Sequence, residues 1–288
     1  MAAKDPQTAY AFCSDCVKQV TFIRHGEAEH NVAVRETGSN EAYSDPRWED
    51  AALTEDGLQQ AVQLQADLLK TGTKFDLVLV SPLMRTLQTA IATFSTEPDV
   101  GSLSALTTPQ GEAKPLPFLA VELIREAFGE HCCDKRSPIS AVQGDFPEVD
   151  FSLVETDDGT SHLAPQIPQP LTHLGPADTW HDEEKRESLR QVAARGQKFI
   201  EFVAALPQRN IAVVSHGVFL ETLFSHVLQC GDPRATAKRF MNCECRTLTL
   251  AFPPAAVPPP PPTRPPHHRH PPTRRSHTPQ TGPARDAV

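Results

Sequence analysis

The sequence lacks a long apolar run: nowhere do about eighteen apolar residues follow one another without a charge. A helix that spans a membrane needs roughly twenty such residues, so none is predicted. The first residues, Met1–Ala11, include Lys4 and Asp5 and contain no apolar core of the kind found in a secretory signal. We therefore expect a cytoplasmic protein without a membrane partner.

The sequence also lacks an even set of cysteines. There are seven, and an odd number in a reducing compartment favours free thiols over a disulfide framework. Cys13 and Cys16 could in principle meet Cys243 and Cys245 at a zinc ion, but the second pair is separated by a single residue, unlike the usual knuckle. Scattered reduced thiols and no metal are the expectation.

A general excess of positive charge is missing as well. The chain carries 27 Lys and Arg against 36 Asp and Glu, a formal net charge of -9. The segment 253–288 holds five arginines and one aspartate, or +4, which leaves -13 for residues 1–252. Because contacts with phosphates dominate binding to nucleic acids, we expect no nucleic-acid partner. Any phosphate must be bound in a local basic site.

The segment 253–288 differs from the rest of the chain in composition. It opens with a run of prolines and continues with histidines and arginines, a composition that cannot form a packed core. It is predicted to be a disordered, proline-rich C-terminal tail. A dispensable tail is the simpler interpretation, and the alternative is docking to a proline-recognising domain.

Short apolar segments predict strands that are buried on both faces. They are Gln19–Ile23, Asp76–Val80, Phe118–Ile124 and Asn210–Val214. Helices are predicted between them: one starting at the N-cap Thr54, one at Ser81-Pro82, one over Asp182–Leu206 and one over Gly217–Gln229. This alternation predicts an α/β fold with an open, mostly parallel sheet flanked by helices. Two stretches near 97–117 and 138–180 do not fit the alternation and are predicted insertions, the second a possible lid.

Polar residues follow three of the four predicted strands, namely Arg24-His25-Gly26, Ser81-Pro82-Leu83-Met84-Arg85-Thr86 and Ser215-His216-Gly217. Ligands of open α/β sheets bind in the crevice at the carboxyl ends of the strands. Two arginines and two histidines are therefore predicted around one crevice. Arginine forks match tetrahedral oxyanions, and free N–H groups at helix starts suit an anion. A histidine beside a phosphate could be a base or acid, a ligand or a nucleophile.

These motifs resemble the histidine phosphatase superfamily, also called the phosphoglycerate mutase-like family. The resemblance rests on Arg24-His25-Gly26-Glu27 with Asn31, Leu53-Thr54-x-x-Gly57-x-x-Gln60-Ala61, Ser81-Pro82-Leu83-x-Arg85-Thr86-x-Gln88-Thr89-Ala90 and Ser215-His216-Gly217, in the family's order. It implies a histidine phosphatase domain over residues 18–252, after an N-terminal extension of residues 1–17.

The resemblance also implies roles for single residues. His25 would be the nucleophile that is phosphorylated and then hydrolysed by water. Arg24, Arg85 and His216 would hold the phosphoryl oxygens, with Asn31 and Gly217 as further substrate-binding residues. The family has a general acid after its third strand, for which Glu126 is chosen over Glu122 because Glu122 lies inside the apolar run. No cofactor is needed, since these side chains supply the positive charge.

Three functions remain open at this stage. The first is a phosphoric monoester hydrolase of the histidine acid phosphatase type, acting on a small phosphorylated substrate. The second is a phosphoglycerate mutase, which is disfavoured because Ile124–Gly129 replaces the mutase-like segment Asn-Glu-Arg-x-Tyr-Gly. The third is a scaffold that binds phosphorylated partners. Lys135 and Arg136 either contact a second anionic group of the substrate or form a solvated pair.

Overall fold

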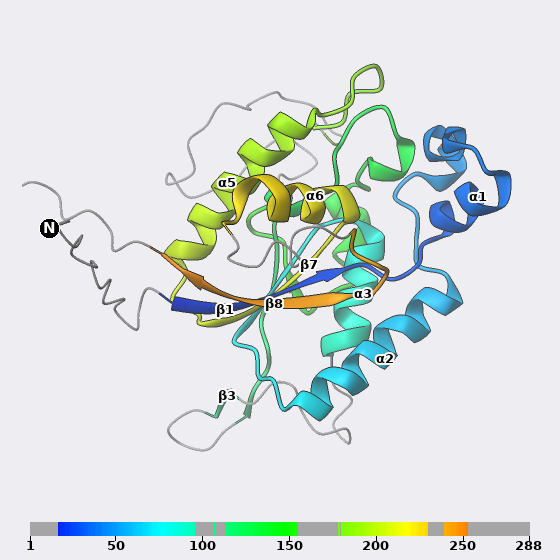
Figure 1. The fold of residues 1–288 in the computed structure, drawn as a ribbon. Coiled ribbons are helices and arrows are strands. Elements are labelled where there is room, and N and C mark those ends of the chain that lie inside the picture. Colours follow the sequence, from blue (N-terminus) through cyan, green and yellow to red (C-terminus); the bar gives the residue numbers. More distant parts are fainter. Residues whose placement is uncertain are drawn as a thin grey trace, which may run out of the picture. The chain divides into compact units, whose positions relative to one another are not determined.

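The computed structural model describes residues 17–95, 106–107, 113–154, 178, 180–229 and 239–252. Within these residues the main sheet has the strand order β6-β5-β2-β7-β1-β8. Its strands are β1 (Val17–Arg24), β2 (Leu77–Val80), β5 (Phe118–Ala120), β6 (Val149–Asp150), β7 (Asn210–Ser215) and β8 (Cys245–Ala251). All neighbours pair in parallel except β1 with β8. The predicted mostly parallel α/β fold is confirmed (Figure 1).

The central strands form where the sequence is continuously apolar. All four residues of β2 are buried, as are five of the six residues of β7. By contrast, β8 alternates between half-buried and exposed positions, which is the pattern of a strand at the edge of a sheet. The sequence reading missed β8 because Arg246, Thr247 and Thr249 interrupt its apolar residues.

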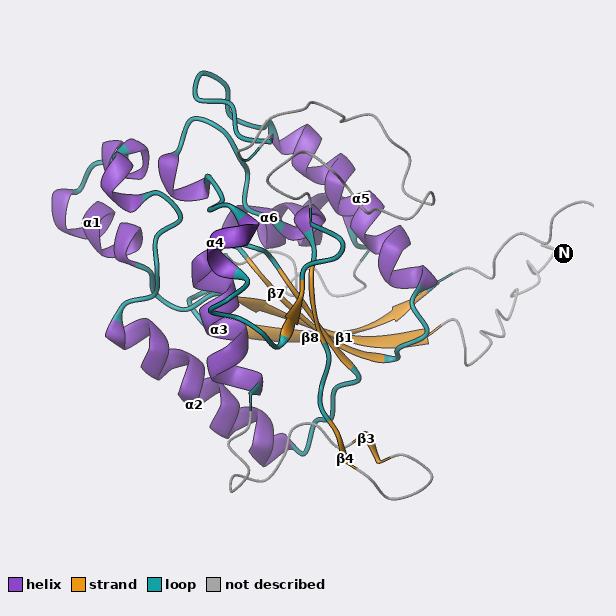
Figure 2. Ribbon diagram, turned by 180° about the vertical axis from the view of Figure 1, so that it is seen from behind, coloured by secondary structure: helices purple, strands orange, loops and turns teal. Residues whose placement is uncertain are grey.

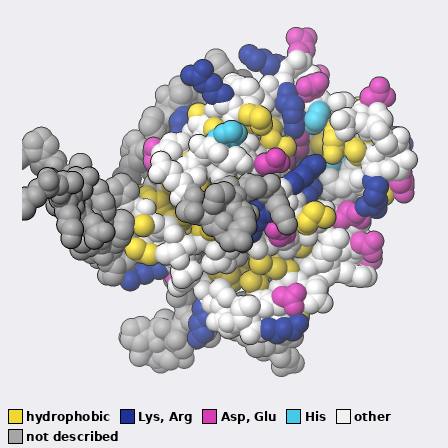
Figure 3. All heavy atoms as spheres, viewed as in Figure 1, with side chains coloured by type: hydrophobic (Ala, Val, Ile, Leu, Met, Phe, Trp, Pro, Cys, Tyr) yellow, Lys and Arg dark blue, Asp and Glu magenta, His cyan; other side chains and the backbone are white. Residues whose placement is uncertain are grey.

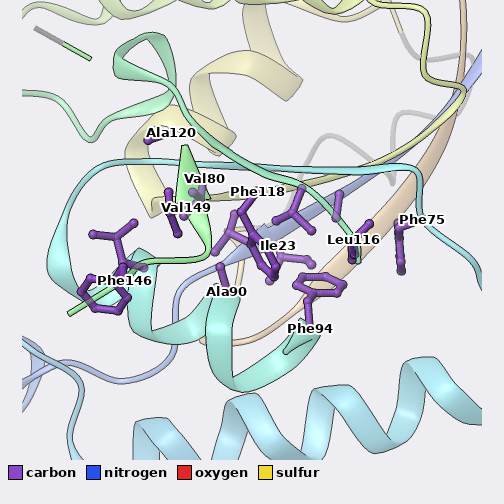
Figure 4. Packing of buried hydrophobic residues seen from close by; sticks show 14 of the residues in the cluster. Ile23, Phe75, Val80, Ala90, Phe94, Leu116, Phe118, Ala120, Phe146 and Val149 are labelled. Atoms are coloured by element: carbon purple, nitrogen blue, oxygen red, sulfur yellow. The ribbon is translucent and has the colours of Figure 1, made fainter. Parts of the chain in front are cut away.

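Helices cover both faces of the sheet. Figures 1 and 2 show α2 (Glu55–Thr71) and α3 (Met84–Phe94) on one side, and α5 (Leu189–Ala205) and α6 (Gly217–Thr222) on the other. Two apolar clusters match these layers. In the first, Ala90 and Phe94 of α3 pack near Ile23, Val80 and Phe118 of the sheet (Figure 4), and the second joins α5 and α6 to the opposite face.

The remaining elements are short. After β1 come α1 (Glu29–Thr37) and the 3₁₀ turns η2 (Asn40–Ser44) and η3 (Pro46–Trp48). After β5 come η4 (Glu122–Ile124), η5 (Cys132–Asp134) and α4 (Ile139–Val142). The hairpin of β3 (Leu106–Thr107) and β4 (Ala113–Lys114) lies in the first predicted insertion. The π-helical turn η6 (Leu223–Val227) continues α6.

Several predicted boundaries were wrong. The third strand ends at Ala120, and Glu122 enters a 3₁₀ turn in which its carboxylate pairs with Arg125, three residues on. The helix expected at Ser81-Pro82 begins at Met84, whose N–H donates to Asp50 at 2.8 Å.

Two further helices also differ from their predicted limits. The helix expected over 182–206 begins at Leu189, where Ser188 and Gln191 form a capping box. The helix expected over 217–229 changes from α to π geometry after Thr222. The Thr54 N-cap was right, since its hydroxyl accepts from the N–H of Gly57 at 3.0 Å.

The N-terminal extension, apart from residue 17, the tail and most of the second insertion lie outside the described residues. In the part that is described, no helix is both long and apolar enough to span a membrane. On the face drawn in Figure 3, basic and acidic side chains are interspersed.

Candidate active site

Three neighbouring strands bring the predicted site residues to one edge of the sheet. Arg24 ends β1 and lies beside Ser215, which ends β7. The N–H of His25 donates to the carbonyl oxygen of Ser215 at 3.0 Å, and the N–H of Ser81 donates to that of Val214 at 3.1 Å. Because the three strands are parallel and adjacent, their carboxyl ends meet there.

His25 is buried and its ring orientation is fixed. Its Nδ1 lies 2.7 Å from the carbonyl oxygen of Gly26. Because that oxygen can only accept, Nδ1 carries the proton and donates the hydrogen bond. In the neutral ring, Nε2 then keeps its lone pair. Burial first, and then Arg85 and Arg24, hold the pKa of His25 well below its ordinary value. The imidazole is therefore neutral at physiological pH and can act as a nucleophile.

Gly26 allows the backbone after His25 to lie against α2. A β-carbon at this position would lie 2.5 Å from the carbonyl oxygen of Gly57, which is closer than a β-carbon can approach such an atom. The N–H of Gly26 donates to the hydroxyl of Thr89 at 3.0 Å. Gly26, Gly57 and Thr89 thus fix the carbonyl group that orients His25.

His216 lies beside His25, with 5.2 Å between the ring centroids. Its Nε2 is 2.8 Å from the hydroxyl of Ser81, while its buried Nδ1 has no hydrogen-bond partner among the described residues. Burial, followed by the charge of Arg85, holds the pKa of His216 well below its ordinary value. The second histidine is therefore also neutral, with one ring nitrogen available to a ligand.

The two arginines supply positive charge around these rings. Arg24 donates from Nη1 to the carbonyl oxygen of Phe240 at 2.8 Å. Arg85 donates from Nη1 to the carbonyl oxygen of Cys133 at 2.6 Å and from Nη2 to Asp134 at 2.9 Å. The buried Nε of each arginine has no partner within the described residues. Both guanidiniums thus keep a donor for an anion.

Glu126 joins this group through the start of α6. Its carboxylate accepts from the N–H groups of Val218 and Phe219, each at 3.1 Å. A β-carbon on Gly217 would lie 3.5 Å from Nε of Arg24 and 3.9 Å from Oε2 of Glu126. The helix start that was expected to face a bound anion therefore holds the side chain of Glu126.

The pKa of Glu126 is raised, first by burial and then by the negative charge of Asp134. The hydrogen bonds from the α6 backbone act in the opposite direction. A carboxyl group with a raised pKa near neutral histidines and arginines can donate a proton. We refer to Arg24, His25, Arg85, Glu126 and His216 as the His25 cluster.

Glu122, the alternative acid, lies in a different group of charges. One of its oxygens is 3.2 Å from Arg125 and the other 3.1 Å from Arg136. Arg125 also forms an ion pair with Asp178, and its Nη1 is 2.6 Å from that carboxylate. We refer to Glu122, Arg125, Arg136 and Asp178 as the Arg125 cluster. Since both oxygens of Glu122 are engaged there, Glu126 is the better candidate for the acid.

The remaining predicted contacts are less direct. The side-chain oxygen of Asn31 accepts from the N–H of Ala28 at 3.1 Å, so only its amide nitrogen could contact an anion. Lys135 forms an ion pair with Glu49 at 3.2 Å. Arg136 is buried against Glu122, which contradicts, for this residue, the alternative of a solvated loop charge.

Two residues near the site were missed from the sequence. His30, in the first turn of α1, is buried with its ring centroid 6.2 Å from that of His25. Its Nδ1 has no partner among the described residues, and burial followed by Arg85 and Arg24 holds its pKa well below the ordinary value. Asp134 contacts Arg85 directly. The only available signal was position: His30 directly precedes Asn31, and Asp134 directly precedes Lys135.

A metal site is not evident in the part of the chain that the structure describes. No group of three or more His, Cys, Asp or Glu side chains there is arranged to hold an ion. Cys243 and Cys245 are free thiols, and Cys13 and Cys16 lie outside the described residues.

Comparisons with known proteins agree with the motifs. Residues 20–106 and 136–252 match the sequence model of the histidine phosphatase superfamily (branch 1). An Arabidopsis thaliana "Phosphoglycerate mutase-like protein" is 35% identical over 252 residues, which cover 81% of this chain and 84% of the relative. A Schizosaccharomyces pombe protein named "Probable phosphatase" is 27% identical over 70% of this chain and 74% of its own length. Among solved structures, the alpha-ribazole phosphatase of Shigella flexneri aligns with 21% identity, a TM-score of 0.46, and coverage of 81% of this chain and 94% of that one.

Proposed function

Because the chain belongs to the histidine phosphatase superfamily (branch 1), we propose that it hydrolyses phosphate monoesters through a phosphohistidine formed on His25. The observation that carries this proposal is the hydrogen bond between Nδ1 of His25 and Gly26. It leaves Nε2 of a neutral, buried ring with a lone pair, beside two arginines that favour an anion.

In the first step, Nε2 of His25 attacks the phosphorus atom and the bond from phosphorus to the ester oxygen breaks. The departing oxygen takes the bonding electrons and receives the proton of Glu126. Arg24, Arg85 and His216 stabilise the charge on the phosphoryl oxygens during the transfer. The amide nitrogen of Asn31 is a further candidate contact.

In the second step, the Glu126 carboxylate takes a proton from water, and the water oxygen attacks phosphorus. The nitrogen–phosphorus bond breaks, and inorganic phosphate leaves. His25 returns to its neutral form and Glu126 to its protonated form. A carboxyl with a raised pKa suits both steps, because it gives up its proton in the first and regains one in the second.

Phosphoglycerate mutase activity is the second candidate, favoured by the name of the Arabidopsis relative. The name of the Schizosaccharomyces pombe relative favours hydrolysis. A mutase must also bind the carboxylate of phosphoglycerate, for which an arginine is the usual partner. In this chain Arg125, in the segment that replaces the mutase-like one, is already paired with Asp178 and Glu122. We therefore place hydrolysis first.

The test uses p-nitrophenyl phosphate, followed by a screen of sugar phosphates, phosphoglycerates, nucleotides and phosphopeptides. His25→Ala should lower turnover by about four orders of magnitude or more and abolish any acid-labile phosphoprotein. The matched control is His226→Ala, since His226 is exposed on η6. Full activity in His25→Ala would refute the nucleophile. Interconversion of phosphoglycerates that needs a bisphosphorylated primer would favour the mutase, and phosphopeptide binding without turnover would favour a scaffold.

A further inference from the structure

Asp134 connects parts of the chain that lie far apart in the sequence. It ends η5 and is only 3% exposed. Its Oδ1 is 2.9 Å from Nη2 of Arg85 on α3, and its Oδ2 is 3.2 Å from Nη1 of Arg186, just before α5. The carboxylate therefore pairs with a residue of the His25 cluster on one side and with a second arginine on the other.

The contact between Asp134 and Arg85 is part of a two-point hold. The other terminal nitrogen of Arg85 donates to the carbonyl oxygen of Cys133 at 2.6 Å. Two consecutive residues thus fix both ends of the guanidinium fork, and Arg85 itself is 1% exposed. With Nη1 and Nη2 occupied, the plane and direction of Nε are determined.

The backbone of Asp134 is in turn held by the Arg125 cluster. Nη2 of Arg125 donates to the carbonyl oxygen of Asp134 at 2.9 Å. Arg125 is paired with Asp178 and Glu122, so its own position is fixed by two carboxylates. The hold on Arg85 therefore extends into the buried ion pairs behind the site.

We propose that Asp134 is a positioning residue that acts through Arg85, fixing the guanidinium where it meets a substrate phosphoryl group. This inference rests on the proposed function for its phosphoryl ligand. A residue that fixes the orientation of a ligand-binding side chain commonly matters almost as much as that side chain. Asp134 also affects Glu126, because its negative charge favours the protonated form of that carboxyl group.

Charged and titratable groups around Glu126 include Asp134, Arg85, Arg24, the Cys133 thiol and Arg195, which donates to the Glu126 carbonyl oxygen, together with the N–H groups of Ala127 and α6. Asp134 raises the pKa of Glu126, after burial, whereas Arg85 lowers it. Removal of the Asp134 charge should lower that pKa. Since the general acid must be protonated, the alkaline limb of kcat/KM should then move to lower pH.

The test compares Asp134→Asn with Asp134→Ala. Asparagine keeps an oxygen that can accept from Arg85 but loses the charge, whereas alanine loses both. Isothermal titration with inorganic phosphate should therefore give a dissociation constant about tenfold higher for alanine than for asparagine, as expected for one charge-assisted hydrogen bond. Both variants should shift the alkaline limb for p-nitrophenyl phosphate to lower pH.

Asp76→Asn is the control, because Asp76 is a carboxylate just before β2, at the end of that strand away from the site, where it accepts from the N–H groups of Arg209 and Asn210. It should lower the melting temperature without producing either change. If the alanine and asparagine variants fold and bind phosphate within twofold of each other, Asp134 does not position Arg85.

The phosphate titration needs no turnover, so the two proposals can fail separately. If the wild type hydrolyses no ester but the Asp134→Ala and Asp134→Asn variants differ in phosphate affinity, the hydrolase is refuted and the role of Asp134 is supported. An active wild type without that difference does the reverse. A wild-type protein that binds no phosphate overturns both.

Discussion

The Arg125 cluster is buried and the His25 cluster is largely so, and both contact Asp134, but they balance their charges differently. In the Arg125 cluster, two arginines face two carboxylates, Glu122 and Asp178. In the His25 cluster, Arg85 pairs with Asp134, Arg24 donates to a carbonyl group, and both histidines are neutral. A balanced set of buried charges holds the fold together, whereas a set with surplus positive charge is completed by an anion.

The difference is also visible in protonation. Burial alone would raise the pKa of Asp178, but Arg125 holds it at about 2. Burial would likewise lower the pKa of Arg125, which Asp178 and Glu122 instead raise. In the His25 cluster, burial and the arginines act in the same direction on the histidines. Arg125 and Asp178 therefore stay ionised, whereas the histidines of the His25 cluster are neutral.

The largest predicted effect is on stability, from Arg125→Met. Removal of Arg125 leaves Asp178 buried without its ion-pair partner and Glu122 with Arg136 alone, which should cost about 3–5 kcal/mol of unfolding free energy. Urea unfolding monitored by circular dichroism measures it. If stability changes by less than about 1 kcal/mol, the Arg125 cluster is not structural and the comparison fails.

The next effect is on catalysis, from Arg85→Lys. Lysine keeps the charge but cannot reproduce the planar fork held by Cys133 and Asp134. We expect kcat/KM for p-nitrophenyl phosphate to fall by roughly 10²–10³-fold. Arg195→Lys provides the control, since Arg195 is also buried and bidentate, to Glu187. A similar loss in both variants would mean that Arg85 acts only through packing.

A smaller effect concerns stability against pH. His25, His30 and His216 stay neutral in the folded protein, so below about pH 6.5 the unfolded chain binds more protons and stability falls as the pH falls. The raised pKa values of Glu126 and Asp50 oppose this trend, because these carboxyls hold protons in the folded state. A single-histidine variant separates the two contributions.

His30→Phe should reduce the slope of unfolding free energy with pH by about 1.4 kcal/mol per pH unit below pH 6.5, the value for one proton. Urea titrations at several pH values between about 5 and 7 measure the slope. His226→Phe, at an exposed position, should leave it unchanged. An unaltered slope in His30→Phe would show that His30 is protonated in the folded protein.

The sequence was sufficient to predict the arrangement around His25 but not the Arg125 cluster. Arg24, Ser81 and His216 directly follow continuous apolar segments, and parallel pairing alone brings such positions together. Arg125 and Asp178 are 53 residues apart, and no periodicity links them. Their pairing depends on how two loops pack, which local patterns do not encode.

The same reason explains the errors after the third strand. The run Phe118–Ile124 was predicted to be one strand because Leu123 and Ile124 continue its apolar character. The charge at Glu122 pairs locally with Arg125 and turns the chain. An ion pair three residues apart fits a helical turn and not a strand, in which side chains alternate between faces.

The smallest predicted effect tests whether Lys135, in the loop after η5, also binds the substrate. Lys135 pairs with Glu49 at a partly exposed position, so Lys135→Gln should change the unfolding free energy by no more than about 0.5 kcal/mol, since solvent screens such pairs. If Lys135 serves only in this pair, KM values for phosphate monoesters should stay within twofold of wild type. A selective rise in KM for substrates with a second anionic group would instead show that Lys135 exchanges Glu49 for the substrate. The surplus positive charge would then extend beyond the His25 cluster, and the division between structural and ligand-binding charges would pass through this loop.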